Sequence, residues 1–402
     1  MADQMQWTNA LSTQPSLEAA ISEVVEQAVG KLSTKPNFGL VFISSAFTSE
    51  YSRLLPLLAR ILDVPVLIGC SGGGVIGTSN GQAQEFEDEA ALSLTLAYLP
   101  DVNIHPFHIV NEELPDLDSS PDAWIDAIGV SPNPTPQFIL LSSNVGGGIN
   151  NLLKGLDFAY PGSAIVGGQA SGGGMGDSIA LFCNDIYRQG TVGVALSGNI
   201  TLDTIVAQGC RPIGTPLQIS KCDRNIILEI EEQVPLILLR DLIANLSESE
   251  KILAQNSLFV GVAMNEFKQD LQQGDFLIRN ILGVDPAAGA IAVGDYLRPG
   301  QRLQFHLRDA QTSAQDLEFL LNKYQQEQAS VPAPVGALMF SCLGRGEGLY
   351  KKPNFDSELF GRYIKDIPLG GFFCNGEIGP VSGSTFVHGF TSVFAIVRQN
   401  EE

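Results

Sequence analysis

The sequence predicts a mixed α/β fold of two domains, in which repeated strand-helix-strand-hairpin units form mixed β-sheets covered by helices. The first observation is that these elements recur in one order along the chain, and such units build mixed sheets with helices on their faces. The second is the length of 402 residues, which suggests two or three domains. The third is that 44% of the residues are hydrophobic, which supplies ample material for a core.

The first repeated unit combines two apolar strands with a glycine-rich turn. An apolar stripe at helical spacing precedes it over residues 17–31. The second strand runs into Gly69–Gly77, and the last two strands are expected to form a hairpin at Pro100-Asp101. In chain order, the expected elements are a strand at 38–43, a helix at 51–62 and strands at 65–68, 89–99 and 102–110.

The same order returns twice further along the chain. The tetrapeptide Ser71-Gly-Gly-Gly74 recurs as Ser171-Gly-Gly-Gly174, so we expect the two glycine turns to occupy equivalent places. The second copy is expected to have strands at 137–141, 164–166, 191–196 and 201–207 and a helix at 149–158. The third, weaker copy is expected to have strands at 336–340, 369–373 and 386–397 and a helix at 355–364.

Different material separates the second and third copies. It is expected to hold a β-ribbon at 217–220 and 225–230, strands at 257–264, 276–282, 288–293 and 301–307, and helices at 235–246 and 313–327. The predicted domains are a helical lead at 1–30, an N-terminal domain at 31–212 with internal repeats at 38–110 and 137–207, and a C-terminal domain at 213–402.

Composition and cysteine spacing exclude several classes of function. A net charge of −21 repels phosphate backbones and anionic lipids, so no nucleic acid or membrane partner is expected. The longest apolar helix candidate, Val234–Leu246, is interrupted by Arg240 and Asp241 and is too short to span a bilayer. The N-terminus lacks the features of a signal peptide. The six cysteines have no Cys-x-x-Cys spacing, so no structural zinc site is expected. No metal ligand and no cofactor is assigned from the sequence. We expect a cytoplasmic protein with free thiols.

Two apolar strands near the C-terminus end in polar residues and form the candidate site. Arg345 follows one strand and Glu377 follows the other, beside glycines that let the backbone approach another group closely. A carboxylate among apolar residues needs a cationic partner, either from the protein or from a ligand. We expect the two strands to be neighbours and both side chains to face one pocket. The residues predicted here to bind a ligand are Arg345, Glu377, Cys342, Cys374, Asn375 and Gly376.

Two interpretations of Arg345 and Glu377 remain open. A guanidinium forks onto a carboxylate, and a carboxylate accepts hydrogen bonds from an ammonium, so the pair suits an amino-acid-like ligand. Alternatively, the two side chains bridge to each other as a buried structural ion pair.

Other motifs give weaker signals of chemistry. Gly72-x-Gly74-x-x-Gly77 matches a dinucleotide-binding pattern, but residues 78–89 do not read as the helix that must follow it. The stretch Gly69-Cys-Ser-Gly-Gly73 fits a hydrolase pattern, which also needs a helix and a placed histidine. No catalytic residue is therefore assigned. A thiol at a strand end, Cys342 first, could serve as a nucleophile, although such cysteines are more often small buried hydrophobes.

A further set of motifs runs through the second half of the chain. They are Gln208-Gly-Cys-Arg-Pro-Ile-Gly214, Pro235-Leu-Ile-Leu-Leu239, Phe276-Leu-Ile-Arg-Asn-Ile-Leu-Gly-Val-Asp285, Phe340-Ser-Cys-Leu-Gly-Arg345 and Gly370-Gly-Phe-Phe-Cys-Asn-Gly-Glu-Ile-Gly-Pro380. In content and order they resemble the FIST family, named for F-box and intracellular signal transduction. The resemblance covers nearly the whole chain, from about residue 30 onward.

The resemblance implies a sensory module that binds small ligands, amino acids among them, without catalysis of its own. It implies an unidentified signalling protein as partner. The family's usual His-Asn-x-Thr is His388-Gly-Phe-Thr391 here, and His388 is kept among the predicted ligand-binding residues although glycine replaces the amide. An enzyme with a Cys342 nucleophile and a scaffold with a vestigial pocket are the alternatives. The sequence leaves the ligand, the partner and the oligomeric state open.

Overall fold

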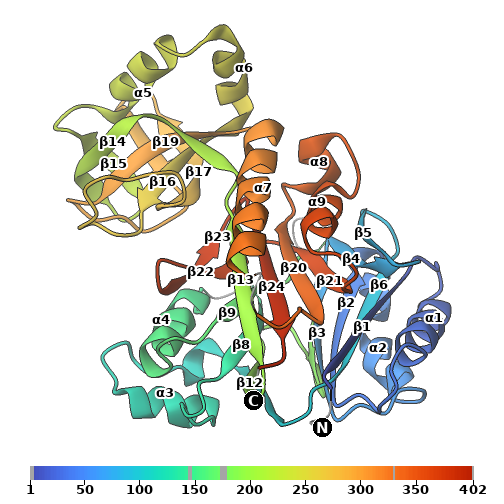
Figure 1. Ribbon diagram of the computed structural model, residues 1–402. Helices are drawn as coiled ribbons and strands as arrows, with labels where there is room; N and C mark the ends of the chain where they lie inside the picture. Colours follow the sequence, from blue (N-terminus) through green and yellow to red (C-terminus); the bar gives the residue numbers. More distant parts are fainter. Residues whose placement is uncertain (1–3, 144–146, 173–178, 329–330, 401–402) are drawn as a thin grey trace. The chain divides into compact units, whose positions relative to one another are not determined.

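The computed structural model describes residues 4–143, 147–172, 179–328 and 331–400 (Figure 1). These residues belong to two compact units. The first unit comprises Met1–Val206, Leu320–Val387 and Thr391–Glu402, and the second comprises Ala207–Phe319 and His388–Phe390. The compact units do not follow sequence order, because the end of the chain returns to the first unit. The predicted boundaries at 31–212 and 213–402 concern the linear sequence and stay a prediction.

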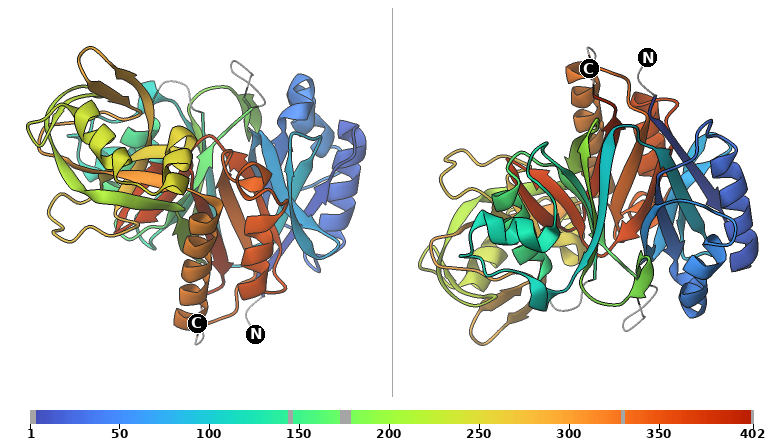
Figure 2. Two further views of the ribbon diagram at one scale, coloured as in Figure 1. Left: turned by 90° about the horizontal axis from the view of Figure 1, so that it is seen from above. Right: turned by 90° about the horizontal axis from the view of Figure 1, so that it is seen from below.

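Within the described residues, the first unit is built from three mixed sheets of six strands each (Figures 1 and 2). Across the first sheet the order is β1 (Gln6–Ser12), β6 (Leu92–Tyr98), β2 (Phe38–Ser44), β3 (Val66–Gly72), β10 (Leu181–Cys183) and β11 (Asp185–Tyr187). Across the second it is β23 (Ser384–His388), β22 (Glu377–Val381), β9 (Ile165–Gln169), β8 (Gln137–Ser142), β12 (Thr191–Gly198) and β7 (Val102–Ile109). Across the third it is β13 (Thr201–Ala207), β24 (Ser392–Arg398), β20 (Gly336–Cys342), β21 (Leu369–Cys374), β4 (Gly74–Ser79) and β5 (Gln82–Glu87).

Each sheet is centred on one repeated unit. The parallel pairs β2–β3, β8–β9 and β20–β21 come from the first, second and third copies. The strand that closes the same copy, β6, β12 or β24, pairs antiparallel with the first strand of that pair. The predicted shared order of strand, helix, strand and closing strand is therefore confirmed in all three copies, together with the mixed α/β fold.

The hairpin of each copy leaves its own sheet and completes another. The β4–β5 hairpin joins β21, the β10–β11 hairpin joins β3, and the β22–β23 hairpin joins β9. In the same way β7 pairs with β12, so the hairpin expected at Pro100-Asp101 is wrong and β6 and β7 lie in different sheets. The short link between two strands does not decide their pairing when each strand finds a better partner elsewhere in the fold.

Three glycines mark equivalent positions in the three copies. An ideal Cβ on Gly69, Gly167 or Gly371 would lie 2.0, 1.8 or 1.9 Å from a carbonyl oxygen of the neighbouring parallel strand. Real Cβ atoms do not approach a backbone oxygen so closely, so only glycine fits at these points. These positions give a common register by which the copies can be compared residue by residue.

The two Ser-Gly-Gly-Gly turns meet each other but are not in the same register. Ser71 lies two residues after Gly69, whereas Ser171 lies four residues after Gly167. Ser71 Oγ donates a hydrogen bond to the Ser171 carbonyl oxygen at 3.1 Å, and the Gly73 amide donates to Ser171 Oγ at 2.8 Å. The expectation of equivalent turns therefore needs correction. The end of the second tetrapeptide, residues 173–174, lies outside the described residues.

Side chains alternate along the central strands between a shared core and the covering helices. In β2, Leu40 and Phe42 point into the core shared by the three sheets, whereas Val41 and Ile43 pack against helices. A strand buried on both faces reads as an unbroken apolar run, which is why these strands were predictable. The covering helices are α1 (Leu17–Val29) and α2 (Tyr51–Leu58) on the first sheet, α3 (Pro121–Ile128) and α4 (Ile149–Ala159) on the second, and α9 (Phe355–Tyr363) on the third (Figure 2).

The second unit contains a closed barrel. Its strands are β14 (Cys210–Asp223), β15 (Ile226–Ile230), β18 (Ala290–Val293), β17 (Phe276–Asp285), β16 (Leu258–Ala263) and β19 (Arg302–Arg308). The predicted ribbon and the four predicted strands are confirmed. The helices α5 (Pro235–Ala244) and α6 (Glu248–Ser257) lie between β15 and β16 in the chain, and α7 (Ala310–Glu327) follows β19. We did not expect α6, which begins with a capping box formed by Ser247 and Glu250.

The predicted helical lead at 1–30 contains a strand as well as a helix. Residues 6–12 form β1, which pairs with β6 at the edge of the first sheet. In the structure, none of the six cysteines forms a disulfide bond. Among the described residues, we find no helix with the length and apolar character needed to cross a membrane.

Candidate functional site

The two strand ends of the candidate site are neighbours, as predicted. Strand β20 runs parallel to β21, and Cys342 at the end of one is paired in register with Cys374 at the end of the other. Arg345 follows β20 in a turn that leads into the short helix α8 (Gly346–Tyr350). Glu377 opens β22 after the turn at Asn375 and Gly376. The fold therefore places both charged residues just beyond the same edge of the parallel pair.

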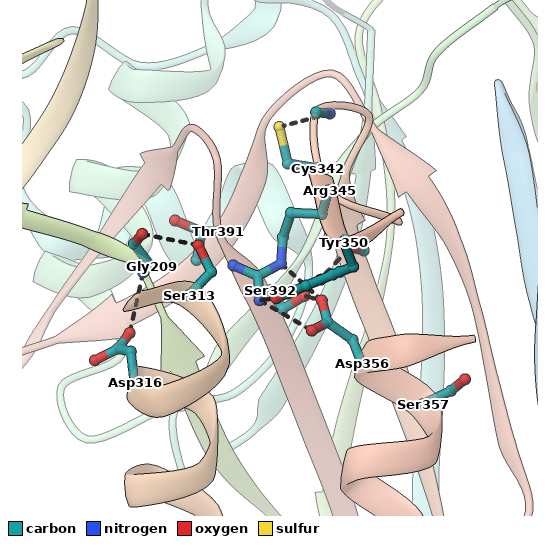
Figure 3. Close-up of polar contacts among 12 residues, drawn as sticks. Gly209, Ser313, Asp316, Cys342, Arg345, Tyr350, Asp356, Ser357, Thr391 and Ser392 are labelled. Carbon is teal, nitrogen blue, oxygen red and sulfur yellow. Dashed lines mark hydrogen bonds and ion pairs between the residues drawn. The ribbon is translucent and has the colours of Figure 1, made fainter. Parts of the chain in front are cut away.

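Arg345 forms a buried ion pair with Asp356, a residue that the sequence analysis did not name. Its Nε donates to Asp356 Oδ2 at 2.7 Å, and its Nη2 donates to Asp356 Oδ1 at 3.0 Å (Figure 3). The side chains are 0% and 1% exposed. Two parallel hydrogen bonds of this kind form the strong, planar fork that arginine makes with carboxylates. Asp356 thus already makes the two hydrogen bonds to the guanidinium that the sequence analysis expected from a ligand carboxylate.

Neighbouring hydroxyl groups complete the surroundings of this ion pair. Arg345 Nη2 donates to the Tyr350 hydroxyl oxygen at 2.6 Å, and Ser392 Oγ donates to Asp356 Oδ2 at 2.9 Å (Figure 3). Ser341, paired with Ser392 across the sheet, lies 3.2 Å from it between the two Oγ atoms. Burial raises the pKa of the Tyr350 hydroxyl, so it stays protonated. The pair is held by groups from three separate elements.

Glu377 is buried with half of its carboxyl group unmatched. The Thr391 amide donates to its Oε2 at 3.1 Å, while its Oε1 is buried without a hydrogen-bond partner. Burial raises the pKa of the Glu377 carboxyl well above its usual range, and the opposing effects of the Thr391 amide and the Arg345 charge are smaller. An unmatched buried carboxyl oxygen destabilises the fold unless something fills its hydrogen-bonding capacity.

The fold itself does not require a carboxylate at this position. Glu377 pairs with Gly168, the residue after the marker glycine of the second copy. At the corresponding points of the other two sheets, Leu181 pairs with Cys70 and Val75 pairs with Phe372. Leu181 and Val75 are fully buried aliphatic residues. The third copy therefore carries a buried acid where the two other copies have ordinary core side chains.

The remaining predicted site residues differ in their placement. Cys374 is fully buried, and burial raises the pKa of its thiol well above the usual range, which disfavours a thiolate. Cys342 is half-buried, and the Gly344 amide donates to its sulfur at 3.5 Å. Asn375 is exposed.

Gly376 and His388 complete the predicted set. Gly376 is buried with φ +145°, and a Cβ there would lie 2.5 Å from Gln169 Oε1. His388 belongs to the second unit. The structure thus brings together Arg345, Cys342, Cys374 and Glu377 in the first unit.

Comparison with protein families decides the identity of the chain. Residues 37–233 match the FIST N domain and residues 235–380 match the FIST C domain. The chain belongs to the FIST family. FIST domains are sensory domains of signal transduction.

Two groups of relatives share this FIST sequence to different extents. An uncharacterized protein of Mycobacterium tuberculosis strain H37Rv is 32% identical over 389 residues, which is 96% of this chain and 98% of that protein. An uncharacterized protein of Mycobacterium bovis is 31% identical over 395 residues, 97% of this chain and 98% of that protein. F-box only protein 22 of Homo sapiens is 32% identical over 76 residues, 15% of this chain and 19% of that protein.

A second buried acid of this FIST protein also escaped the sequence analysis. Glu85 on β5 is 7% exposed and accepts a hydrogen bond from the Ser357 amide at 2.7 Å, while Asn354 Oδ1 accepts from the Glu85 amide at 2.6 Å. These bonds fasten β5 to the first turn of α9, the helix that carries Asp356. Glu85 Oε2 is buried without a hydrogen-bond partner. No local pattern marks this residue, because its surroundings come from a segment far along the chain.

Glu85 should make the stability of the first unit depend on pH. Burial, helped by the Asp356 charge, raises the pKa of Glu85 to about 7, above its ordinary value of 4.5. The folded state therefore holds this proton more tightly than the unfolded state, so stability from this group falls as pH rises from about 4.5 to about 7. Over this pH range the contribution of Glu85 to the free energy of unfolding falls by about 3 kcal/mol. Glu85→Gln should remove most of it, as measured by urea unfolding at about pH 5 and about pH 8.

Tryptophan fluorescence can follow this unfolding selectively. Trp7 and Trp124 are the two tryptophans of the chain, and both are buried in the first unit. Glu112→Gln, which removes an exposed carboxylate, controls for the change in net charge. An equal pH dependence in the wild type and in Glu85→Gln would contradict the assignment to Glu85.

Within the described residues, no group of three or more histidine, cysteine, aspartate or glutamate side chains is arranged to hold a metal ion. The site contains a buried carboxyl, Glu377, beside an arginine that already forms a fork with Asp356. Such a carboxyl suits a group that donates hydrogen bonds and carries positive charge.

Proposed function

We propose that this FIST protein is a sensory module that binds a small ligand through Glu377, without catalysis of its own, and passes the signal to a protein partner. The ligand carries a primary ammonium group, as amino acids and related amines do. One observation supports the proposal. Glu377 Oε1 is buried without a hydrogen-bond partner, whereas the equivalent positions of the other two copies hold the buried aliphatic residues Val75 and Leu181. A residue that destabilises the fold, at a position where the other copies have an aliphatic side chain, is a candidate functional residue.

Arg345 has a supporting role in this proposal. Because its fork is filled by Asp356, we assign it to positioning the turn after β20 rather than to holding a ligand carboxylate. Its charge still lowers the pKa of Glu377 and so favours the ionised carboxylate when an ammonium arrives. Cys342, half-buried at the same strand end, lines the way to the carboxyl in this proposal. We also propose a cytoplasmic location, which suits six cysteines that form no disulfide bond.

A thermal-shift screen with three matched ligand classes tests the proposal. Amino acids keep both charges, their decarboxylated amines keep only the ammonium, and N-acetylated amino acids keep only the carboxylate. We expect compounds of the first two classes to raise the melting temperature, by roughly 2–4 °C per kcal/mol of binding linkage. N-acetylated compounds should have no effect, and Glu377→Leu should abolish every shift. If no amine stabilises the wild type, or if Glu377→Leu responds equally, the proposal fails and the scaffold alternative is favoured.

A further inference from the structure

The end of the β20–β21 pair carries two cysteines where the other copies have serine, glycine or alanine. On the second strand of each parallel pair, the residues three positions after the marker glycines are Gly72, Ala170 and Cys374. On the first strand, the residues at the matching end are Ser44, Ser143 and Cys342. The repeated fold therefore accepts a serine beside a glycine or an alanine at this point, and it does not require two thiols.

The two cysteines meet the geometric requirement for a disulfide bond. Cys342 and Cys374 are paired in register on adjacent parallel strands, which lie about 4.8 Å apart. Phe340 and Phe372, two residues earlier on these strands, both belong to the core shared by the three sheets. Because side chains alternate along a strand, both thiols point to that same face. A disulfide joins cysteines whose Cα atoms are about 4.4–6.8 Å apart and whose Cβ atoms do not point away from each other.

The two sulfur atoms differ in their access to dissolved molecules. Cys374 is 0% exposed, and burial raises the pKa of its thiol well above the usual range, with the nearby Glu377 charge adding to the effect. Cys342 is half-buried at the start of a turn, and the Gly344 amide donates to its sulfur at 3.5 Å. A donated N–H also stabilises negative charge on the atom that accepts it. An oxidant from solution therefore reaches Cys342 first, and Cys374 is the second thiol to react.

We propose that Cys342 and Cys374 form a peroxide-sensing dithiol, in which a hydroperoxide converts the two thiols to a reversible disulfide. The Cys342 sulfur attacks a peroxide oxygen and the O–O bond breaks, which gives a sulfenic acid and, with the thiol proton, an alcohol or water. The Cys374 sulfur then attacks the sulfenic sulfur, and the hydroxyl group leaves with the second thiol proton as water. The two sulfur atoms together lose the two electrons that reduce the peroxide. A thiol reductant returns two electrons and two protons and restores both thiols.

The disulfide lies beside the carboxyl of the proposed function. The Cys342 side chain shares a hydrogen bond with Glu377, and the Glu377 charge acts on the Cys374 thiol. Formation of the disulfide removes the thiol hydrogen from the first of these contacts, so oxidation changes the surroundings of the carboxyl. Any effect on a ligand rests on the proposed function, whereas formation of the disulfide does not.

Thiol counting after peroxide treatment of the full chain tests this inference. Hydrogen peroxide is the probe, and the remaining thiols are alkylated in urea without reduction before the intact mass is measured. The untreated protein should take six alkyl labels, and the treated protein should take four, which is six minus the two joined cysteines. Peptide mapping should find Cys342 linked to Cys374, and dithiothreitol should restore six labels.

Variants that copy the other repeats separate the roles of the two thiols. Cys374→Ala introduces the side chain of Ala170 and Cys342→Ser that of Ser143, so both should fold. In Cys374→Ala, the sulfenic acid at Cys342 should persist and be trapped by dimedone. In Cys342→Ser, Cys374 should lose its thiol roughly tenfold more slowly than in the wild type, because the oxidant does not reach it. Cys222→Ser, which removes another half-buried thiol, is the matched control and should still form the disulfide.

The outcomes are independent of the amine screen. A linked Cys342–Cys374 peptide supports the dithiol even where no amine binds, and amine binding without that peptide overturns the dithiol while it supports the proposed function. Six remaining labels, a bond from Cys374 to Cys70, or a sulfinic acid at Cys342 in place of the bond would each overturn the inference. An equal yield of the linked peptide from the chain unfolded in urea would also overturn it, because the register of the folded strands would then have no part in the reaction.

Discussion

Asp356→Asn is expected to lower the free energy of unfolding of the first unit by about 3–5 kcal/mol. The substitution leaves the Arg345 guanidinium, which is 0% exposed, facing a neutral amide in place of a carboxylate. An uncompensated buried charge is among the most destabilising changes that a single substitution makes. Urea unfolding followed by the fluorescence of Trp7 and Trp124 measures the loss in the unit that contains the pair.

A double-mutant cycle and an exposed pair provide the controls. Arg345→Met alone should also destabilise, but combining it with Asp356→Asn should restore part of the loss, because no unpaired charge remains. Asp63→Asn removes the partner of Lys35 at the surface, where the side chains are 85% and 63% exposed, and should change stability by no more than about 1 kcal/mol. If Asp356→Asn and Asp63→Asn lower the free energy of unfolding equally, the buried Arg345–Asp356 ion pair contributes no more to stability than an exposed one.

Glu377→Leu is expected to leave stability within about 1 kcal/mol of the wild type while abolishing amine binding. Leucine removes a buried carboxyl with an unmatched oxygen and restores the kind of side chain found at Leu181 and Val75. The structural losses are the acceptor of the Thr391 amide and the interactions of the carboxyl with Arg345 and Cys342, and loss of the hydrogen bond offsets the gain by about 1–3 kcal/mol. Loss of a charge-assisted contact should weaken ligand binding at least ten- to a hundredfold.

Stability and affinity must be measured together to interpret this variant. Calorimetric titration with an amine from the screen gives the affinity, and urea unfolding gives the stability. Val75→Leu is the matched control, because it alters the corresponding position of another copy without touching a carboxyl. A loss of more than about 2 kcal/mol in Glu377→Leu, with binding unchanged, would show that Glu377 is a structural residue.

The central strands and the pairing of two strand ends could be predicted because the information is local. Runs such as Phe38–Ser44 are apolar throughout, as expected for strands buried on both faces. The pairing of Cys342 with Cys374 follows from the repeat, since each copy places its two strands side by side. The sequence analysis did not predict the strand Gln6–Ser12, because polar residues interrupt this edge strand and leave no such run.

The partners of the buried charges could not be predicted, for a different reason. Arg345 meets Asp356 only because a helix begins between them at Phe355, and the chain offers 44 acidic residues as candidates. Glu377 is paired with Gly168 of the second copy only because the hairpins are exchanged between copies. Such contacts are set by the tertiary fold, and spacing along the sequence carries no trace of them.

The exchange of hairpins between copies has a consequence for synthesis of the protein. Strand β9 of the second copy obtains its neighbour β22 only after the whole barrel sequence has left the ribosome. Until then the growing chain carries an open sheet edge, together with a β4–β5 hairpin whose partner β21 does not yet exist. Open edges recruit strands from other chains, so the nascent protein is exposed to aggregation until β21 and β22 emerge. Translation that stops within the barrel therefore yields a chain suited to capture by chaperones rather than a smaller folded protein.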